Sequence, residues 1–147
     1  MIDILLLQGA NMNWLGKREP ELYGTTSAAE LNDIVLAHAK TLGLSLDIFY
    51  TNTEGTAIDR IYQAAQDGVA GLVMNPAGFT YGGFALRDCL RAVRLPYVEV
   101  HMTNIERRGT RSLTMAEADG VIIGLGVDSY RLGLDAIVAV LNQRPTV

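Results

Sequence analysis

With 147 residues, 49% of them hydrophobic and 19% charged, the chain has the size and composition of one globular domain. Its formal net charge of -4 argues against nucleic acid or an anionic membrane surface as partners, and no apolar run approaches the roughly 20 residues that span a bilayer. A single cysteine excludes an intrachain disulfide, and the N-terminus lacks the basic start of a signal peptide, so we expect a cytoplasmic protein.

Short apolar runs alternate with segments of helical periodicity along the chain. Strands are predicted at residues 2–7, 44–50, 70–74, 95–100 and 120–124, and helices at 28–42, 58–68, 82–93 and 130–141. The first helix begins with the capping-box spacing of Ser27 and Glu30. This alternation predicts one α/β domain, residues 1–147, with a doubly wound parallel sheet and helices on both faces. For five strands the commonest arrangement is the flavodoxin-like order 2-1-3-4-5.

Three unusual connections follow strands 1, 3 and 4. The first, residues 8–24, is much longer than the roughly 2–6 residues of an ordinary strand-to-helix loop. The others are residues 75–81, which contain Pro76 and Gly78, and the arginine-bearing segment 102–113. Because strands 1 and 3 flank the switch point of the predicted sheet, all three loops should open onto one crevice. The alternative for residues 8–24 is a structural loop packed by its own apolar residues. In either case we expect Trp14 and Leu15 to anchor it.

The loops favour acid–base chemistry on a small anionic molecule over other classes of reaction. No G-x-S-x-G elbow or Walker sequence occurs, and the glycine-containing segment 124–129 follows the last strand, where a dinucleotide signature is weak. Two histidines and one cysteine are too few for a convincing zinc site, so we expect no metal. Neither lysine ends a buried strand, as a Schiff-base lysine would be expected to do. The basic cluster around Arg108 and Arg111 could meet an anion.

Tyr23 is the candidate base. A tyrosine phenol ordinarily keeps its proton up to about pH 10, so a tyrosine that acts as a base near neutrality needs a cation beside it. Arg18 lies on the same loop and cannot lose its own proton. The alternative for Arg18 is a surface ion pair with Glu19 or Glu21.

His101 is the candidate acid, because Glu99 stands two residues before it and can orient its ring. Asn11 or Asn75 could hold a developing oxyanion, directly or through a water, although both also suit plain turns. His38 falls on the apolar face of the first helix, where a structural histidine is expected.

A series of motifs in unbroken order carries a family resemblance over nearly the whole chain. The motifs are Gly9, Asn11, Asn13, Leu15-Gly16, Arg18-Glu19-Pro20, Tyr23-Gly24, Asn52, Glu54-Gly55, Asn75-Pro76, Ala85-Leu86-Arg87-Asp88, Val98-Glu99-Val100-His101, Asn104, Gly120-Val121-Ile122 and Tyr130-Arg131-Leu132. The sequence resembles the type II 3-dehydroquinate dehydratases. The resemblance implies a flavodoxin-like protomer, a dodecamer of trimers, and a cofactor-free elimination of water from 3-dehydroquinate through an enolate to give 3-dehydroshikimate. Such a lyase serves the shikimate pathway of aromatic amino acid biosynthesis or quinate catabolism.

By position, the resemblance also implies roles for individual residues. Tyr23 resembles the base, Arg18 the cation that assists it, His101 the acid that protonates the departing hydroxyl, Glu99 the residue that holds His101, and Asn11 the residue that places a water against the enolate oxygen. Asn75 and the backbone of Met102 and Thr103 resemble the groups that bind substrate. Asp88 resembles an acidic residue supplied to a neighbour's site across the trimer interface. The alternative for Asp88 is a helix-surface ion pair with Arg91.

Several positions depart from the family pattern. The family usually has histidines where Thr53 and Tyr81 stand, and we expect Tyr81 to contact the substrate from that position. The family's first loop begins Asn-Gly-Pro where this chain has Gln8-Gly9-Ala10. The segment 106–112 is several residues short and has no histidine. Arg108 fits the family's first arginine, and Arg111 fits the second only if the gap follows it. The alternatives are a paralogue that acts on a related cyclic hydroxy-keto acid and a non-catalytic flavodoxin-like module.

Overall fold

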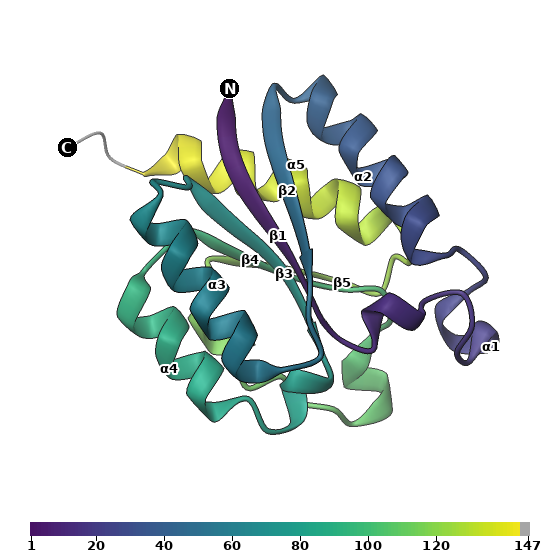
Figure 1. The fold of residues 1–147 in the computed structure, drawn as a ribbon. Helices are drawn as coiled ribbons and strands as arrows, with labels where there is room; N and C mark the ends of the chain where they lie inside the picture. The colour runs from purple at the N-terminus through teal and green to yellow at the C-terminus, as the bar shows by residue number, and fades with distance from the viewer. Residues whose placement is uncertain (145–147) are drawn as a thin grey trace.

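The computed structural model describes residues 1–144 as a five-stranded parallel sheet between two layers of helices (Figure 1). The strand order is β2-β1-β3-β4-β5, which confirms the predicted flavodoxin-like arrangement. The strands are β1 (Ile2–Ala10), β2 (Leu44–Tyr50), β3 (Gly71–Ala77), β4 (Tyr97–His101) and β5 (Gly120–Ile123). All four strand pairings are parallel.

The helices cover both faces of the sheet and divide the core in two. They are α1 (Pro20–Tyr23), α2 (Ala28–Thr41), α3 (Glu54–Gln66), α4 (Phe84–Val93) and α5 (Asp128–Gln143). Helices α2 and α5 pack on one face around Val35, Leu134 and Ile137, whereas α3 and α4 pack on the other around Ile61 and Leu86. Because both faces are covered, the two central strands β1 and β3 are continuously apolar over Ile4 to Leu7 and Leu72 to Met74, a pattern typical of a parallel sheet. Among residues 1–144, no helix has the length and apolar character to cross a bilayer.

The helix boundaries follow local signals. Ser27 caps α2 through the predicted capping box: the Glu30 amide donates to Ser27 Oγ at 3.1 Å, and the Ser27 amide donates to a Glu30 carboxylate oxygen at 3.4 Å. Helices α3 and α5 begin earlier than their apolar periodicity indicates, at Glu54 and Asp128. Their first turns are polar, and acidic residues are favourable at the positive end of the helix dipole.

Two central strands continue past the residues that the sequence assigned to them. Strand β1 runs on to Ala10 and β3 to Ala77, and the two pair at Gln8 with Asn75 and at Ala10 with Ala77. The prediction that residues 75–77 form a loop is therefore wrong. The polar side chains of Gln8 and Asn75 interrupted the apolar pattern, yet both are buried because hydrogen bonds satisfy most of their polar atoms.

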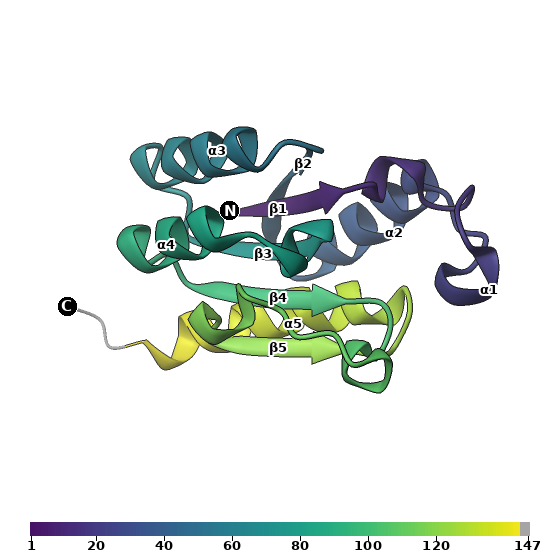
Figure 2. The same cartoon turned by 90° about the horizontal axis from the view of Figure 1, so that it is seen from below.

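The carboxyl ends of the strands all lie at one edge of the sheet (Figure 2). Between Gln8 and Ala10, Gly9 lies so close to β3 that a Cβ atom would stand 2.2 Å from the carbonyl oxygen of Pro76. The backbone of Gly9 fixes the position of such a Cβ atom, and the oxygen that it would meet belongs to the backbone of Pro76, so no side-chain rotation can relieve the contact. Gly9 therefore sets how closely the first and third loops approach each other.

Gly9→Ala should lower the free energy of unfolding by about 2 kcal/mol or more, because overpacking against backbone forces the two strands apart. Urea unfolding followed by circular dichroism measures the change. Gly55→Ala, in the first turn of α3, is the matched control, since no heavy atom of residues 1–144 lies within 4 Å of its added Cβ. Equal stability of the two variants would show that the β1–β3 approach is not tight at this point.

Candidate active site

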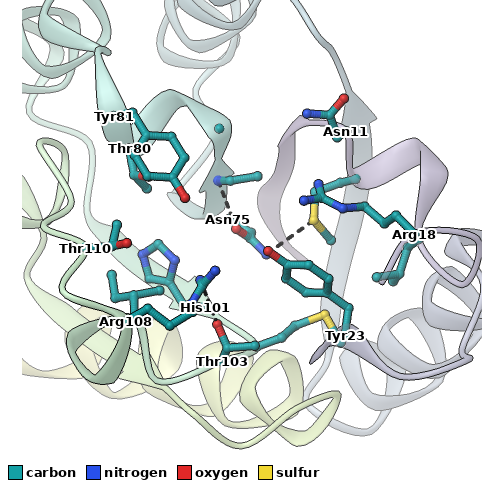
Figure 3. A pocket seen from close by; sticks show the side chains of 16 residues that line it. Asn11, Arg18, Tyr23, Asn75, Thr80, Tyr81, His101, Thr103, Arg108 and Thr110 are labelled. Atoms are coloured by element: carbon teal, nitrogen blue, oxygen red, sulfur yellow. Dashed lines mark hydrogen bonds between the residues drawn. The ribbon is translucent and has the colours of Figure 1, made fainter. Parts of the chain in front are cut away.

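One pocket lies where the loops after β1, β3 and β4 meet (Figure 3). The structure thus brings together the three connections that the sequence singled out. Nine of the predicted site residues line the pocket: Asn11, Arg18, Tyr23, Asn75, Tyr81, His101, Met102, Thr103 and Arg108. The other lining residues are Met12, Leu15, Ala77, Gly78, Thr80, Ile105 and Thr110.

The first loop carries a phenol and a guanidinium into the pocket. The guanidinium of Arg18 lies 4.6 Å from the centre of the Tyr23 ring, in a cation–π contact. Tyr23 ends the short helix α1 and is half-buried against the core. Arg18 also lies 3.8 Å from the Glu19 carboxylate, so the ion pair that was the alternative for Arg18 is present alongside the contact with Tyr23. This ion pair is weak, because its two charged groups are 3.8 Å apart and both side chains are partly exposed to water.

The start of this loop is fixed by a side chain from another loop. Asn11 adopts a left-handed conformation, with φ of 73°, and its backbone N–H donates to Oδ1 of Asn52 at 2.7 Å. Asparagine tolerates this conformation better than most residues. Leu15 is buried and anchors the loop as expected, but Trp14 is 53% exposed, with the Lys17 ammonium 4.4 Å from its ring centre. The prediction that Trp14 is an anchor is therefore wrong.

Strand β4 brings a carboxylate and an imidazole into direct contact. Nε2 of His101 lies 2.6 Å from Oε2 of Glu99, and both residues are buried. The other Glu99 oxygen, Oε1, accepts from the Tyr97 hydroxyl at 2.6 Å and from the Thr114 hydroxyl. Glu99 does not itself line the pocket, so its effect on a ligand must pass through His101.

The hydrogen bonds around Glu99 overcome the effect of its burial. Burial alone would raise the pKa of this carboxyl, but the hydrogen bonds that it accepts, first that from His101 and then those from Thr114 and Tyr97, outweigh burial and lower the pKa below its usual value. Glu99 is therefore ionised at neutral pH although it is out of contact with water.

Asn75 belongs to a buried network that motif reading did not reveal. Its Nδ2 donates to the Tyr130 hydroxyl at 2.8 Å, and Tyr130 in turn donates to Oε1 of Gln8 at 2.8 Å. Its Oδ1 accepts from the Ala77 amide at 3.0 Å. Nε2 of Gln8 has no partner among the described residues. The sequence does contain a signal for Gln8 and Asn75, because each is a polar residue at the end of an apolar strand. It contains none for Tyr130, which is far from both in sequence.

The structure separates the two candidate arginines. Arg108 lies in the pocket, where its Nη2 donates to Thr103 Oγ1 at 2.9 Å. Arg111 lines a neighbouring hollow with Ser112 and Met115. Of the two, only Arg108 is placed to meet a ligand beside His101.

Positions on the rim of the site have varied environments. Tyr81 is 67% exposed and lines the pocket, whereas Thr53 is the N-cap residue of α3 and lies outside it. Asp88 is exposed on α4, away from its own chain's pocket. The alternative of an Asp88–Arg91 ion pair is not what the structure shows, because the Arg91 guanidinium bonds Glu117 at 2.7 and 3.0 Å.

The second histidine has a structural place, as expected. His38 lies on α2, and its Nε2 is 2.8 Å from Oδ1 of Asp135 on α5. The pair joins two helices on the far face of the sheet from α3 and α4.

Comparison with known proteins assigns this arrangement to a family. The model of the family described as dehydroquinase class II matches residues 2–138. The chain belongs to that family. It is 44% identical over 145 residues to a 3-dehydroquinate dehydratase of Xanthomonas oryzae, covering 97% of this chain and 98% of the relative. A 3-dehydroquinate dehydratase of Ralstonia nicotianae is 44% identical over 140 residues, covering 93% and 90%.

Solved structures extend the likeness of this class II chain to three dimensions. The type II dehydroquinase of Butyrivibrio crossotus matches with a TM-score of 0.89 and 32% identity, over 93% of this chain and 97% of that one. A 3-dehydroquinate dehydratase-like protein of Bifidobacterium longum matches with a TM-score of 0.73 and 28% identity, over 97% and 100%. The family match therefore extends to the strand order on which the pocket depends.

Glu99→Gln should change how stability depends on pH. The pKa of Glu99 is lowered on folding, so its ionised form contributes stability that is present above the usual glutamate pKa and is lost as pH falls through the folded value. Glutamine cannot titrate. The free energy of unfolding of the wild type should exceed that of the variant by about 1–3 kcal/mol near pH 7. That difference should narrow below about pH 4.

Urea unfolding at a series of pH values measures this difference. Glu106→Gln, exposed on the 3₁₀ helix Ile105–Arg108, is the control and should show only a small difference from wild type at every pH. A difference for Glu99→Gln that stays constant down to the lowest pH would contradict an ionised, hydrogen-bonded Glu99.

Proposed function

We propose that this protein is a 3-dehydroquinate dehydratase, which eliminates water from 3-dehydroquinate through an enolate to give 3-dehydroshikimate. The observation that carries the proposal is the pocket of Figure 3, which Tyr23, Arg18 and His101 line together. Arg18 contacts the Tyr23 ring, and the buried Glu99 carboxylate bonds His101. Membership of the dehydroquinase class II family and the names of relatives that match over nearly the full length support the same reaction.

The chemistry needs one base and one acid, and the proton count balances between them. Ionised Tyr23 takes the proton alpha to the ketone, which leaves an enolate. Protonated His101 gives its proton to the departing hydroxyl, which leaves as water while the ring double bond forms in conjugation with the ketone. Tyr23 gains one proton and His101 loses one, so a single transfer between them through solvent resets the site. No electron transfer is required, and we propose that no cofactor takes part.

Arg18 and Glu99 serve these two groups. The guanidinium of Arg18 favours the phenolate because an opposite charge stabilises the ionised form. Glu99 favours the imidazolium and directs Nδ1 of His101 toward the substrate, since Nε2 already bonds the carboxylate.

The remaining lining residues would bind and orient the substrate. Asn11 would place a water against the enolate oxygen, and Asn75 would bind a substrate hydroxyl. The backbone of Met102 and Thr103 would bind the substrate carboxylate, with Arg108 beside them. The exposed side chain of Tyr81 would cover the substrate at the rim of the pocket.

We propose further that the protein forms a dodecamer of trimers in the cytoplasm, in the shikimate pathway or in quinate catabolism. The exposed position of Asp88, outside its own chain's pocket, supports a contribution to a neighbour's site. The single cysteine, which is free and buried, is compatible with a reducing compartment.

A paralogue that uses the same groups on a related cyclic hydroxy-keto acid is the second candidate. Tyr81, at the pocket rim, and the short arginine segment after His101 favour it, because both change groups that a substrate would meet. A non-catalytic flavodoxin-like module differs from both enzymes in a simple way. A flavin-binding module would be coloured when purified.

Incubation of the purified protein with 3-dehydroquinate tests the proposal. The product is a conjugated enone, so ultraviolet absorbance should rise with time. A small panel of related cyclic hydroxy-keto acids, assayed in parallel, separates the dehydratase from the paralogue. Folded protein that turned over another acid but not 3-dehydroquinate would overturn the proposed substrate.

Tyr23→Phe should lower kcat at least about a hundredfold, because the base is lost while the ring remains in place. Binding of a substrate analogue, measured by calorimetry, should stay close to wild type. Tyr62→Phe, on the exposed side of α3, is the matched control and should retain wild-type kcat. If Tyr23→Phe kept wild-type kcat, Tyr23 would not be the base.

Arg108→Gln and Arg111→Gln should differ in their effect on KM. Loss of the pocket arginine should raise KM about tenfold or more, because a charge-assisted hydrogen bond to the substrate carboxylate is removed. Arg111 lines a separate hollow, so its loss should change KM by less than about threefold. The reverse ranking in steady-state kinetics would show that the arginine segment rearranges around the substrate.

A further inference from the structure

We propose that Tyr97 and Thr114 are positioning residues that fix the Glu99 carboxylate, so that Glu99 holds His101 in one tautomer with Nδ1 toward the pocket. The starting observation is the occupancy of the two carboxylate oxygens. Oε1 accepts from both hydroxyls, and Oε2 is left for His101. The kinetic part of the inference rests on the proposed function, whereas the tautomer does not.

Strand geometry explains why Tyr97 can reach Glu99. Alternate residues of a strand point to the same face, so Tyr97, Glu99 and His101 form a line along one side of β4. Val98 and Val100 point to the opposite side, into the core under α2 and α5. The line is buried from end to end, with exposed fractions of 1%, 0% and 4%.

Thr114 approaches Glu99 from a different segment and completes a one-way chain of donors. A hydroxyl has one proton, and an ionised carboxylate can only accept. Thr114 therefore donates to Glu99, and Ser112, whose Oγ lies 3.2 Å from Thr114 Oγ1, must donate to Thr114. Thr114 directly precedes the 3₁₀ helix Met115–Glu117, and none of its surface is exposed.

The same logic determines the histidine tautomer. Since ionised Glu99 can only accept, Nε2 of His101 must carry the proton of the 2.6 Å bond. Nδ1 is then the nitrogen that exchanges a proton with the ligand. Burial and the neighbouring Glu99 charge raise the pKa of Tyr97 well above its usual value, so the phenol remains a donor.

Other groups that face His101 do not provide this restraint. Arg108, Tyr81 and Tyr23 line the same pocket as His101 and belong to short helical segments in the connections after β4, β3 and β1. None of them bonds Glu99 among the contacts of residues 1–144. Without the Tyr97 and Thr114 hydroxyls, the carboxylate would lose both partners that hold Oε1 and could rotate about its terminal torsion.

Nitrogen-15 spectroscopy of the imidazole rings tests the inference. The chain has only two histidines, so a spectrum of His38→Gln assigns the His101 signals. At a pH where the ring is neutral, wild type should show a single tautomer with the proton on Nε2. The double variant Tyr97→Phe, Thr114→Val should show mixed tautomers and a kcat about tenfold lower, with KM nearly unchanged because neither residue touches the pocket.

Three single variants keep the test decisive if the double variant does not fold. Thr114→Ser restores the hydroxyl and should restore the wild-type tautomer and kcat, whereas Thr114→Val should not. Tyr130→Phe removes another buried tyrosine hydroxyl, one that bonds Gln8 and Asn75, and should leave the His101 tautomer unchanged. A single Nε2–H tautomer and unchanged kcat in the double variant, or in Thr114→Val where the double variant does not fold, would overturn the inference. A changed tautomer in a protein without dehydratase activity would overturn only the proposed function.

Discussion

The Glu99 carboxylate is ionised in the interior of the protein, and the arrangement of the site depends on keeping it so. An ionised carboxylate without partners would be very costly to bury, so its position requires donors on both oxygens. Strand β4 provides His101 and Tyr97 at alternate positions, and Thr114 adds a third donor. A surface histidine would rotate freely, whereas His101 is bonded to a carboxylate that also accepts from two other buried side chains. The donors that compensate for burying the charge thereby also orient the proposed acid.

The other half of the site has a different physical character. Tyr23 and Arg18 lie on a long loop whose Met12 and Leu15 are buried in the core, and the Asn11–Asn52 hydrogen bond ties the start of this loop to the loop after β2. The side of the pocket that holds His101, the proposed acid, is therefore built into the sheet, and the side that holds Tyr23, the proposed base, is carried on a partly exposed segment. This division suits the proposed reaction, in which the substrate must enter before Tyr23 meets it. The close approach of β1 and β3 at Gly9 determines the spacing of the two strands from which the first and third loops begin.

Much of the fold could be predicted because it rests on local patterns. Apolar runs, the Ser27–Glu30 capping box and the alternation of strands and helices are sequence signals, and the common strand order then places the three long loops together. The candidate base, cation and acid followed from the residue types in those loops and from the family resemblance. The strand ends were misjudged because Gln8 and Asn75 are polar, and their burial depends on Tyr130, which is distant from both in sequence. Trp14, Thr114 and the choice between Arg108 and Arg111 depended on loop conformation, which no local pattern encodes.

The most direct test of the account is a crystal structure of the Tyr23→Phe variant with 3-dehydroquinate bound. The account predicts the substrate in the pocket of Figure 3, with Nδ1 of His101 within hydrogen-bond distance of the departing hydroxyl. The edge of the substituted aromatic ring should face the carbon that loses its proton, and His101 Nε2 should remain bonded to Glu99. A substrate bound in the hollow beside Arg111, or oriented with its departing hydroxyl away from His101, would contradict the account.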